Sequence, residues 1–223
     1  MFSKELGVKL DKYHLLKHPF YQKYWNEGKL TREIIKDYAE QYYQHVKAFP
    51  RYISATHSIC EDLEKRKILL ENLQDEENKD GDHPKLWKNF AKAMGADEKE
   101  IEKVKLDWFT KDMIDNFFSQ ARKSYAEGLA SLYTYERQIP EIAETKIQGL
   151  KKFYGVSSQE GLEFFEAHKS ADVIHRAECE KLLDSLSKEE QIKAEKASVL
   201  TARYLWNFLS GMTSKHKLEQ IAA

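Results

Sequence analysis

Residues 164–183, FFEAHKSADVIHRAECEKLL, constrain the fold most, because the predicted helix carries polar groups on a face that should be buried. His168, Asp172 and His175 follow steps of four and three, which place them on one narrow arc of a helix. Phe165 and Cys179 share that arc, so it should turn inward. Two imidazoles and a carboxylate on a buried face are costly unless a partner such as a metal ion binds them. A surface helix that carries this spacing by chance is the alternative, and the run alone does not decide.

Helical periodicity extends over almost all of the 223 residues, and no segment alternates strictly between apolar and polar residues. Only 4 Pro and 9 Gly punctuate the chain, and no stretch has the composition of a linker. We therefore predict an all-α fold with one domain over residues 1–223, built from seven or eight helices around one core. The last ~10 residues are expected to form a disordered tail.

Individual helix boundaries follow from capping and proline signals. Thr31 is a candidate N-cap, and Pro50 should kink or divide the helix that follows. One long helix is predicted over about 109–138. Ser187 should cap the last long helix, whose predicted core stripe includes Leu200.

Composition excludes several classes of function. The net charge of −1 gives no electrostatic reason to expect nucleic acid or an anionic membrane as a partner. No stretch is long and apolar enough to span a membrane, and the N-terminus lacks the apolar core of a signal peptide. Two cysteines, Cys60 and Cys179, are too few for a disulfide framework. These features predict a cytoplasmic protein with both thiols in the core.

Two charged residues fall inside apolar helical stripes. Glu136 shares a stripe with leucines and Tyr133, where a carboxylate is uncommon without a partner. Lys146 lies in the middle of the stripe of the next helix, which Pro140 should open. A buried salt bridge for Glu136 and a stem that reaches solvent for Lys146 are the structural alternatives.

The segment LQDEENKDGDHPKLW is ambiguous by itself. Glu76 should close a helix, and His83 lies seven residues later, in a break that Gly81 and Pro84 create. The two side chains can reach one ion, although acidic runs are usually solvated. His45 is expected to be a hydrogen-bonded core histidine.

In chain order, the anomalous residues resemble the ligands of the haem-oxygenase-like dimetal oxidases, relatives of the TenA proteins and of PQQ synthesis protein C. The segments YYQHVKAFPRYISATHS, LLENLQDEEN and LYTYERQIPEIAETKIQGL are similar to chlamydial members of that family. The similarity extends from about residue 20 to 179, and more loosely to about 210. The expected ligands are Glu76, His83, Glu136, His168, Asp172 and His175.

The resemblance implies an oxygen-activating enzyme with two metal ions, Fe/Fe or Mn/Fe, and molecular oxygen as co-substrate, consistent with a mixed N/O ligand set. It implies synthesis of 4-aminobenzoate for folate from tyrosine, which is expected to be the enzyme's own Tyr21. Lys146 is implied as the amino donor, and Tyr21, Tyr38 and Tyr135 are candidates for substrate or radical relay.

The expected division of ligands puts Glu76, His83 and His175 on one ion and His168 with Asp172 on the other, with Glu136 bridging or near both.

Other functions stay open at this point. The same site could oxidise another small substrate, or the chain could be an oxidase like PQQ synthesis protein C. The resemblance also implies binding of death-domain proteins, which no other feature of the sequence supports. A homodimer is expected because this fold often dimerises, and the reductant is unknown.

Overall fold

Helices form almost all of the computed structural model. It describes residues 1–79 and 82–221, with the side chains in these ranges except those of residues 170–173 and 221. No strand occurs in the described ranges, so the prediction of an all-α fold is confirmed. The helices of nine or more residues are α1 (Phe2–Leu10), α2 (Arg32–Ser58), α3 (Leu63–Glu76), α4 (His83–Ala93), α6 (Trp108–Lys123), α7 (Tyr125–Glu136), α8 (Ile139–Phe153), α9 (Gln159–Asp184) and α10 (Lys188–Lys215). The short elements are η1 (Asp11–Tyr13), η2 (Leu15–Lys17), the π-helix η3 (Phe20–Trp25), α5 (Glu98–Ile101) and α11 (Leu218–Ile221).

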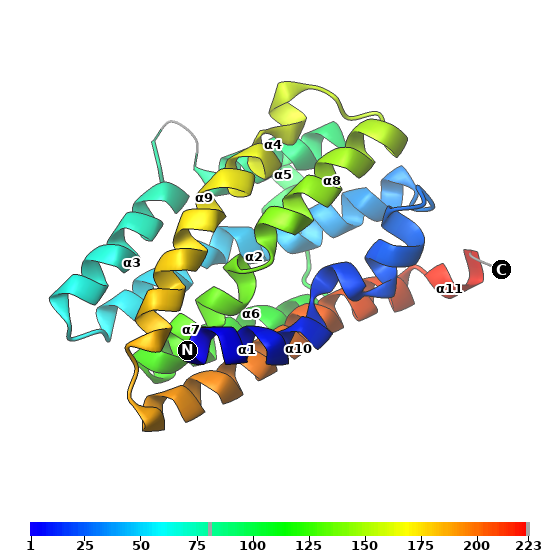
Figure 1. Cartoon of the computed structure of the whole chain (residues 1–223). Coiled ribbons are helices and arrows are strands. Elements are labelled where there is room, and N and C mark those ends of the chain that lie inside the picture. Colours follow the sequence, from blue (N-terminus) through cyan, green and yellow to red (C-terminus); the bar gives the residue numbers. More distant parts are fainter. Residues whose placement is uncertain (80–81, 222–223) are drawn as a thin grey trace.

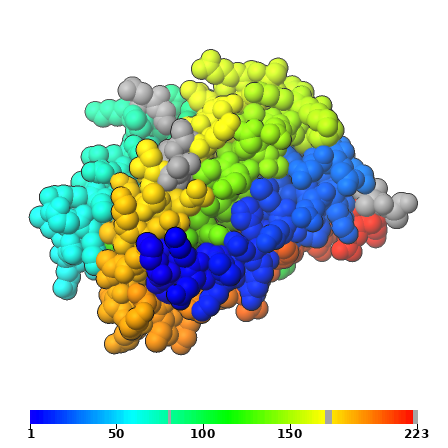
Figure 2. Space-filling view, in the orientation of Figure 1, coloured from blue at the N-terminus to red at the C-terminus, as the bar shows by residue number. Residues whose placement is uncertain are grey.

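The long helix α2 runs through the middle of the molecule and contacts α3, α4, α6 and α7 (Figure 1). Helix α9 packs between α4 and α8 and also contacts α7, while α10 packs along α6 and α7. Figure 2 shows α1, in dark blue, lying against the yellow and orange segments of α9 and α10. Helices α3, α4, α7 and α9 therefore converge beside α2, and the candidate site lies among them.

Capping side chains begin the helices largely as the sequence predicts. The Thr31 side chain accepts a hydrogen bond from the backbone N–H of Ile34 at the start of α2. Ser187 and Glu190 form a complete capping box at the start of α10. Pro50 lies within α2 but does not divide it, contrary to one of the two expectations.

The predicted helix over about 109–138 is wrong, because the chain breaks at Ser124. This residue has an extended backbone (φ −158°, ψ 160°) and caps α7 by accepting a hydrogen bond from Glu127 N–H. The Ser124–Glu127 spacing is a start signal that continuous apolar periodicity concealed.

Two expectations about the core are also wrong. Leu200 is 38% exposed on α10, because the inward stripe of that helix passes through other positions. His45 is fully buried, but neither ring nitrogen has a hydrogen-bond partner in the described part of the chain.

None of the described helices combines the length and apolar character needed to span a bilayer.

Candidate metal centre and adjoining cavity

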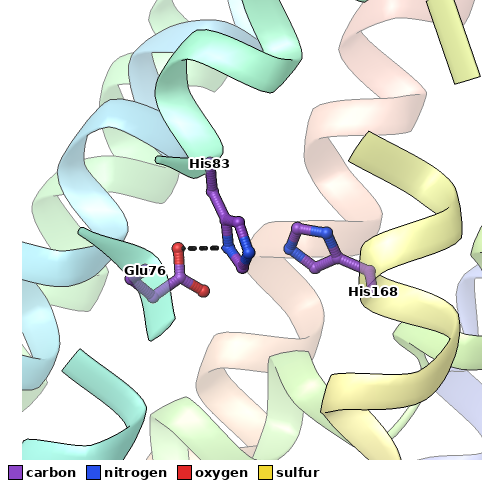
Figure 3. Close-up of side chains that lie close together, drawn as sticks. All are labelled: Glu76, His83 and His168. Carbon is purple, nitrogen blue, oxygen red and sulfur yellow. Dashed lines mark ion pairs between the residues drawn. The ribbon is translucent and has the colours of Figure 1, made fainter. Parts of the chain in front are cut away.

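Three of the predicted ligands point toward one another in the interior (Figure 3). Glu76 is the last residue of α3, His83 is the first residue of α4, and His168 lies in α9. All three are buried, and one ligand atom from each lies within 4.8 Å of the others. Side chains that are far apart in sequence thus form one cluster of nitrogen and oxygen donors.

Local capping explains how Glu76 and His83 come together across a short connection. Helix α3 ends at Glu76, and Asp82 caps α4 by accepting a hydrogen bond from Lys85 N–H. Pro84 suits the first turn of α4, because its fixed φ is helical and its missing N–H is not needed there. His83 therefore begins a helix, whereas the sequence placed it in the break.

The tautomer of His168 follows from its backbone contact. Its Nδ1 lies 2.7 Å from the carbonyl oxygen of Phe164, and a carbonyl can only accept, so Nδ1 carries the proton. Burial, followed by the nearby His83, lowers the pKa of His168 well below its usual value, which keeps the ring neutral. The remaining nitrogen, Nε2, then has a free lone pair. Histidines that bind metals usually hold their second nitrogen in this way.

Glu76 and His83 form a close buried pair. Their Oε2 and Nδ1 atoms are 2.8 Å apart, and the His83 and His168 rings are 4.2 Å apart between centroids. A cation can replace a proton shared between a carboxylate and an imidazole, because both groups offer lone pairs once deprotonated.

The donor set suits a transition metal. Two imidazoles with one carboxylate is a combination found in non-haem iron sites and also accepted by manganese. Ligands about 2.1 Å from a shared ion are at most about 4.2 Å apart, so the cluster needs to contract by less than about 1 Å. We conclude that these three residues fit one such ion.

The other predicted ligands are arranged differently. Glu136, 1% exposed, accepts hydrogen bonds from Asn72 and Cys179. His175, 4% exposed, has Nε2 3.0 Å from Oδ2 of the half-exposed Asp75. Asp172 belongs to α9, but its side chain lies outside the described residues. His168, not His175, therefore joins Glu76 and His83, which differs from the expected division of ligands.

A small cavity adjoins the cluster at His168. Its lining includes four tyrosines and the buried Lys146, and the free volume is about 20 Å³, enough for about one water molecule. The predicted functional residues at this cavity are Tyr21, Tyr38, Tyr135 and Lys146. Because His168 belongs to both features, an ion in the cluster would lie at the edge of this cavity.

Lys146 is buried in an aromatic environment. Its side chain is 3% exposed and donates a hydrogen bond to the Tyr38 hydroxyl at 2.5 Å. Nζ lies 4.5 to 5.4 Å from the centroids of four rings, those of Tyr38, Tyr42, Trp87 and Phe165. Burial lowers the pKa of Lys146 to about 7, so a large fraction of the amine is neutral at physiological pH. This burial excludes the alternative that the Lys146 side chain extends to solvent.

The cavity tyrosines form two hydrogen-bonded pairs. The hydroxyls of Tyr21 and Tyr38 are hydrogen-bonded, as are those of Tyr42 and Tyr135. Burial is the main cause that raises the pKa of Tyr21, Tyr38 and Tyr42 far above the usual value, so these phenols stay protonated. The stacked Tyr38 and Tyr42 rings, 5.4 Å apart between centroids, join the two pairs.

Two neighbours of the site were not predicted from the sequence. Asn72 precedes Glu76 by one helical turn on α3, so its place on the same face was recoverable from the spacing. Trp87, which faces Lys146 and Phe164, has no such signal, because a tryptophan on an apolar face usually indicates core.

The fold and the cluster together define an all-helical protein with a candidate metal centre buried among its helices. The sequence model of the TENA/THI-4/PQQC family matches residues 6–215 of this chain. The chain therefore belongs to this family. A TenA homologue from Pseudomonas syringae pv. tomato has the same fold, with a TM-score of 0.83, 16% identity and coverage of 96% of this chain and 93% of that chain.

Two curated relatives are more similar in sequence. The chain is 42% identical over 209 residues to a 4-aminobenzoate synthase of Chlamydia muridarum, which covers 93% of this chain and 88% of the relative. It is 38% identical over 225 residues to a 4-aminobenzoate synthase of Nitrosomonas europaea, with coverage of 95% and 90%.

Proposed function

We propose that this protein is a metal-dependent oxygenase that makes 4-aminobenzoate, the product named for its curated relatives. We further propose that the aromatic ring comes from its own Tyr21 and the nitrogen from Lys146. The observation that carries the proposal is the double position of His168, which belongs to the metal-ligand cluster and also lines the cavity that holds Tyr21 and Lys146.

The proposed centre holds two ions of iron or manganese. Glu76, His83 and His168 would bind one ion, and Glu136, Asp172 and His175 are the proposed ligands of the second, with Glu136 shared with the first. Such ions, with coordination positions left open, would supply the capacity to activate molecular oxygen. The cavity has room for about one water molecule, and its small size would protect reactive species from side reactions with solvent.

The contacts of Lys146 support its role as amino donor. Its amine donates to Tyr38, which is hydrogen-bonded to Tyr21, so the three side chains form one continuous chain. Because burial lowers the pKa of Lys146 to about 7, the amine retains a lone pair in much of the population near neutral pH. A charged ammonium has no lone pair with which to attack or to be oxidised.

The size of the cavity supports a substrate that is part of the chain. An apolar cavity of about 150 Å³ is the size that accommodates one free benzene ring. The cavity beside His168 has about 20 Å³ free, which is too small for a separate aromatic ring, and four tyrosine rings line it. A tyrosine that is already inside needs no entry route.

Isotope labelling tests the source of the ring. The protein is produced with ring-deuterated tyrosine, purified without metal, and loaded with Fe²⁺ and Mn²⁺. Unlabelled tyrosine, oxygen and a chemical reductant are then added, and 4-aminobenzoate is measured by mass spectrometry. Deuterated product and a matching mass loss from the intact chain are expected. Unlabelled product would refute the self-derived substrate, and absence of product with every combination of the two metals would refute the function.

Tyr21→Phe and Tyr24→Phe form a matched pair for this experiment. Both tyrosines are buried in η3, but only Tyr21 lines the cavity. Tyr21→Phe should abolish the product, whereas Tyr24→Phe should retain most of it. Equal loss in both variants would show that η3 serves as a structural element and does not provide the substrate.

A further inference from the structure

Protein donors hold both carboxylate oxygens of Glu136. Asn72 Nδ2 donates to Oε1 at 2.7 Å, and the Cys179 thiol donates to Oε2, with Sγ 3.5 Å away. All three residues are at most 3% exposed. Burial of a carboxylate is costly unless donors of this kind replace the lost water.

The two donors come from the helices that also carry predicted metal ligands. Asn72 precedes Glu76 by one turn on α3, and Cys179 follows His175 by one turn on α9. Residues four apart lie on the same face of a helix. The carboxylate of Glu136, on α7, is therefore tied to the two helices whose relative position decides where the other ligands lie.

The two donors restrict the orientation of the Glu136 carboxylate. The terminal torsion of a glutamate is broad and roughly two-fold, so an untethered carboxylate can rotate. Hydrogen bonds at both oxygens restrict this rotation. An ionised carboxylate has about four lone-pair directions, which is more than the hydrogen bonds from Asn72 and Cys179 use.

We propose that Asn72 and Cys179 are positioning residues that hold Glu136 in the orientation needed to bridge two metal ions. This inference rests on the proposed dinuclear centre. Asn72 carries the larger part of the effect, because an amide–carboxylate hydrogen bond of 2.7 Å is strong. A thiol is a weak donor, so Cys179 carries the smaller part.

A titration of the full-length, metal-free protein with Mn²⁺ alone and without oxygen tests the proposal. Electron paramagnetic resonance measures free Mn²⁺ and reveals exchange coupling between bridged ions. Wild type should bind two equivalents that are coupled. Asn72→Leu should weaken the equivalent that depends on Glu136 by about 10- to 100-fold, the usual effect of removing a residue that supports a ligand, and should reduce the coupling.

The cysteine variants provide an independent test in case Asn72→Leu does not fold. Cys179→Ala removes the donor and should weaken Mn²⁺ binding by less than Asn72→Leu does. Cys179→Ser restores an O–H donor and should bind Mn²⁺ as wild type does. Identical affinity and coupling in wild type, Cys179→Ala and Asn72→Leu would overturn the proposal.

Matched controls separate positioning from loss of stability. Asn116 is a buried amide on α6 that donates to Thr201 Oγ1 at 3.0 Å, and Cys60 is the second buried free thiol. Asn116→Leu and Cys60→Ala should leave Mn²⁺ binding unchanged even if the melting temperature falls. A loss of affinity in Asn116→Leu equal to that in Asn72→Leu would refute a specific role.

Failure of the dinuclear centre itself gives a different result. In that case wild type binds fewer than two Mn²⁺ ions, or binds two without coupling, and both the proposed centre and the positioning role are refuted. Two coupled ions in wild type and in Asn72→Leu alike would refute only the positioning role.

Discussion

Replacement of Lys146 by methionine should change how the stability of the protein depends on pH. Methionine replaces the apolar stem of the lysine and removes the titrating amine, which donates a hydrogen bond to the Tyr38 hydroxyl. In the folded protein, burial lowers the pKa of Lys146 from 10.5 to about 7. In the unfolded chain the amine returns to water, and its pKa returns to about 10.4.

The sign of the effect follows from which state binds more protons. Below pH 7 the amine is charged in both states, so the full cost of burying the charge lowers the stability of wild type. Between about pH 7 and 10.5 only the unfolded state stays protonated, so the stability of wild type rises with pH. For a difference of one bound proton, each pH unit changes the free energy of unfolding by about 1.36 kcal/mol. The increase between pH 7 and 9.5 is therefore roughly 3 kcal/mol.

Urea unfolding of the metal-free protein at several pH values between 6.5 and 9.5 measures this effect. The free energy of unfolding of wild type, minus that of Lys146→Met, should rise by about 3 kcal/mol over that range. Lys196→Met, a change at an exposed position on α10, serves as the control for removing a lysine. If wild type and Lys146→Met keep a constant difference, the amine stays charged in the folded protein, and its proposed role as a neutral donor fails.

Three further perturbations test other parts of the structure. His45→Leu should raise the free energy of unfolding by about 1–3 kcal/mol, because it removes two buried nitrogens that have no partner among the described residues, and a fall measured in denaturant would contradict this explanation. Gly149→Ala should cost about 1–3 kcal/mol despite the better helix propensity of alanine, because the added Cβ would lie 2.3 Å from Trp25 Nε1; an unchanged melting temperature would show that Trp25 moves freely. His168→Ala should lose at least one bound metal ion by elemental analysis, and an unchanged metal content would exclude the cluster as the site.

Polar residues within apolar stripes were the sequence signal that located the buried site. Glu136 and Lys146 both lie in such stripes, and both are buried, at 1% and 3% exposure. The stripe predicts the direction of the side chain, because helical periodicity decides which face turns inward. It does not predict the partner. The amide and thiol that bind Glu136 come from two other helices, and the ring cage around Lys146 comes from α2, α4 and α9.

The errors in the predicted helix boundaries have a different cause from the missing partners of Glu136 and Lys146. Apolar periodicity continues through Ser124, so it cannot reveal that the chain bends there; only the capping side chain does. Pro50 led to the opposite error. Proline usually breaks a helix, but α2 continues through Pro50. The position of Asp75 against His175 depends on how α3 and α9 pack, which local spacing does not encode.

The contacts that orient the two proposed ligands His168 and Glu136 differ in how far they depend on the fold. His168 is oriented by the carbonyl of Phe164, four residues earlier on its own helix, so α9 itself supplies the acceptor of this contact. Glu136 is oriented by side chains on α3 and α9, so its orientation requires three helices to be in place. The conformation of His168 should therefore survive substitutions elsewhere in the core that displace Glu136. A sequence can reveal the first kind of support from spacing alone, whereas the second kind requires the assembled tertiary structure.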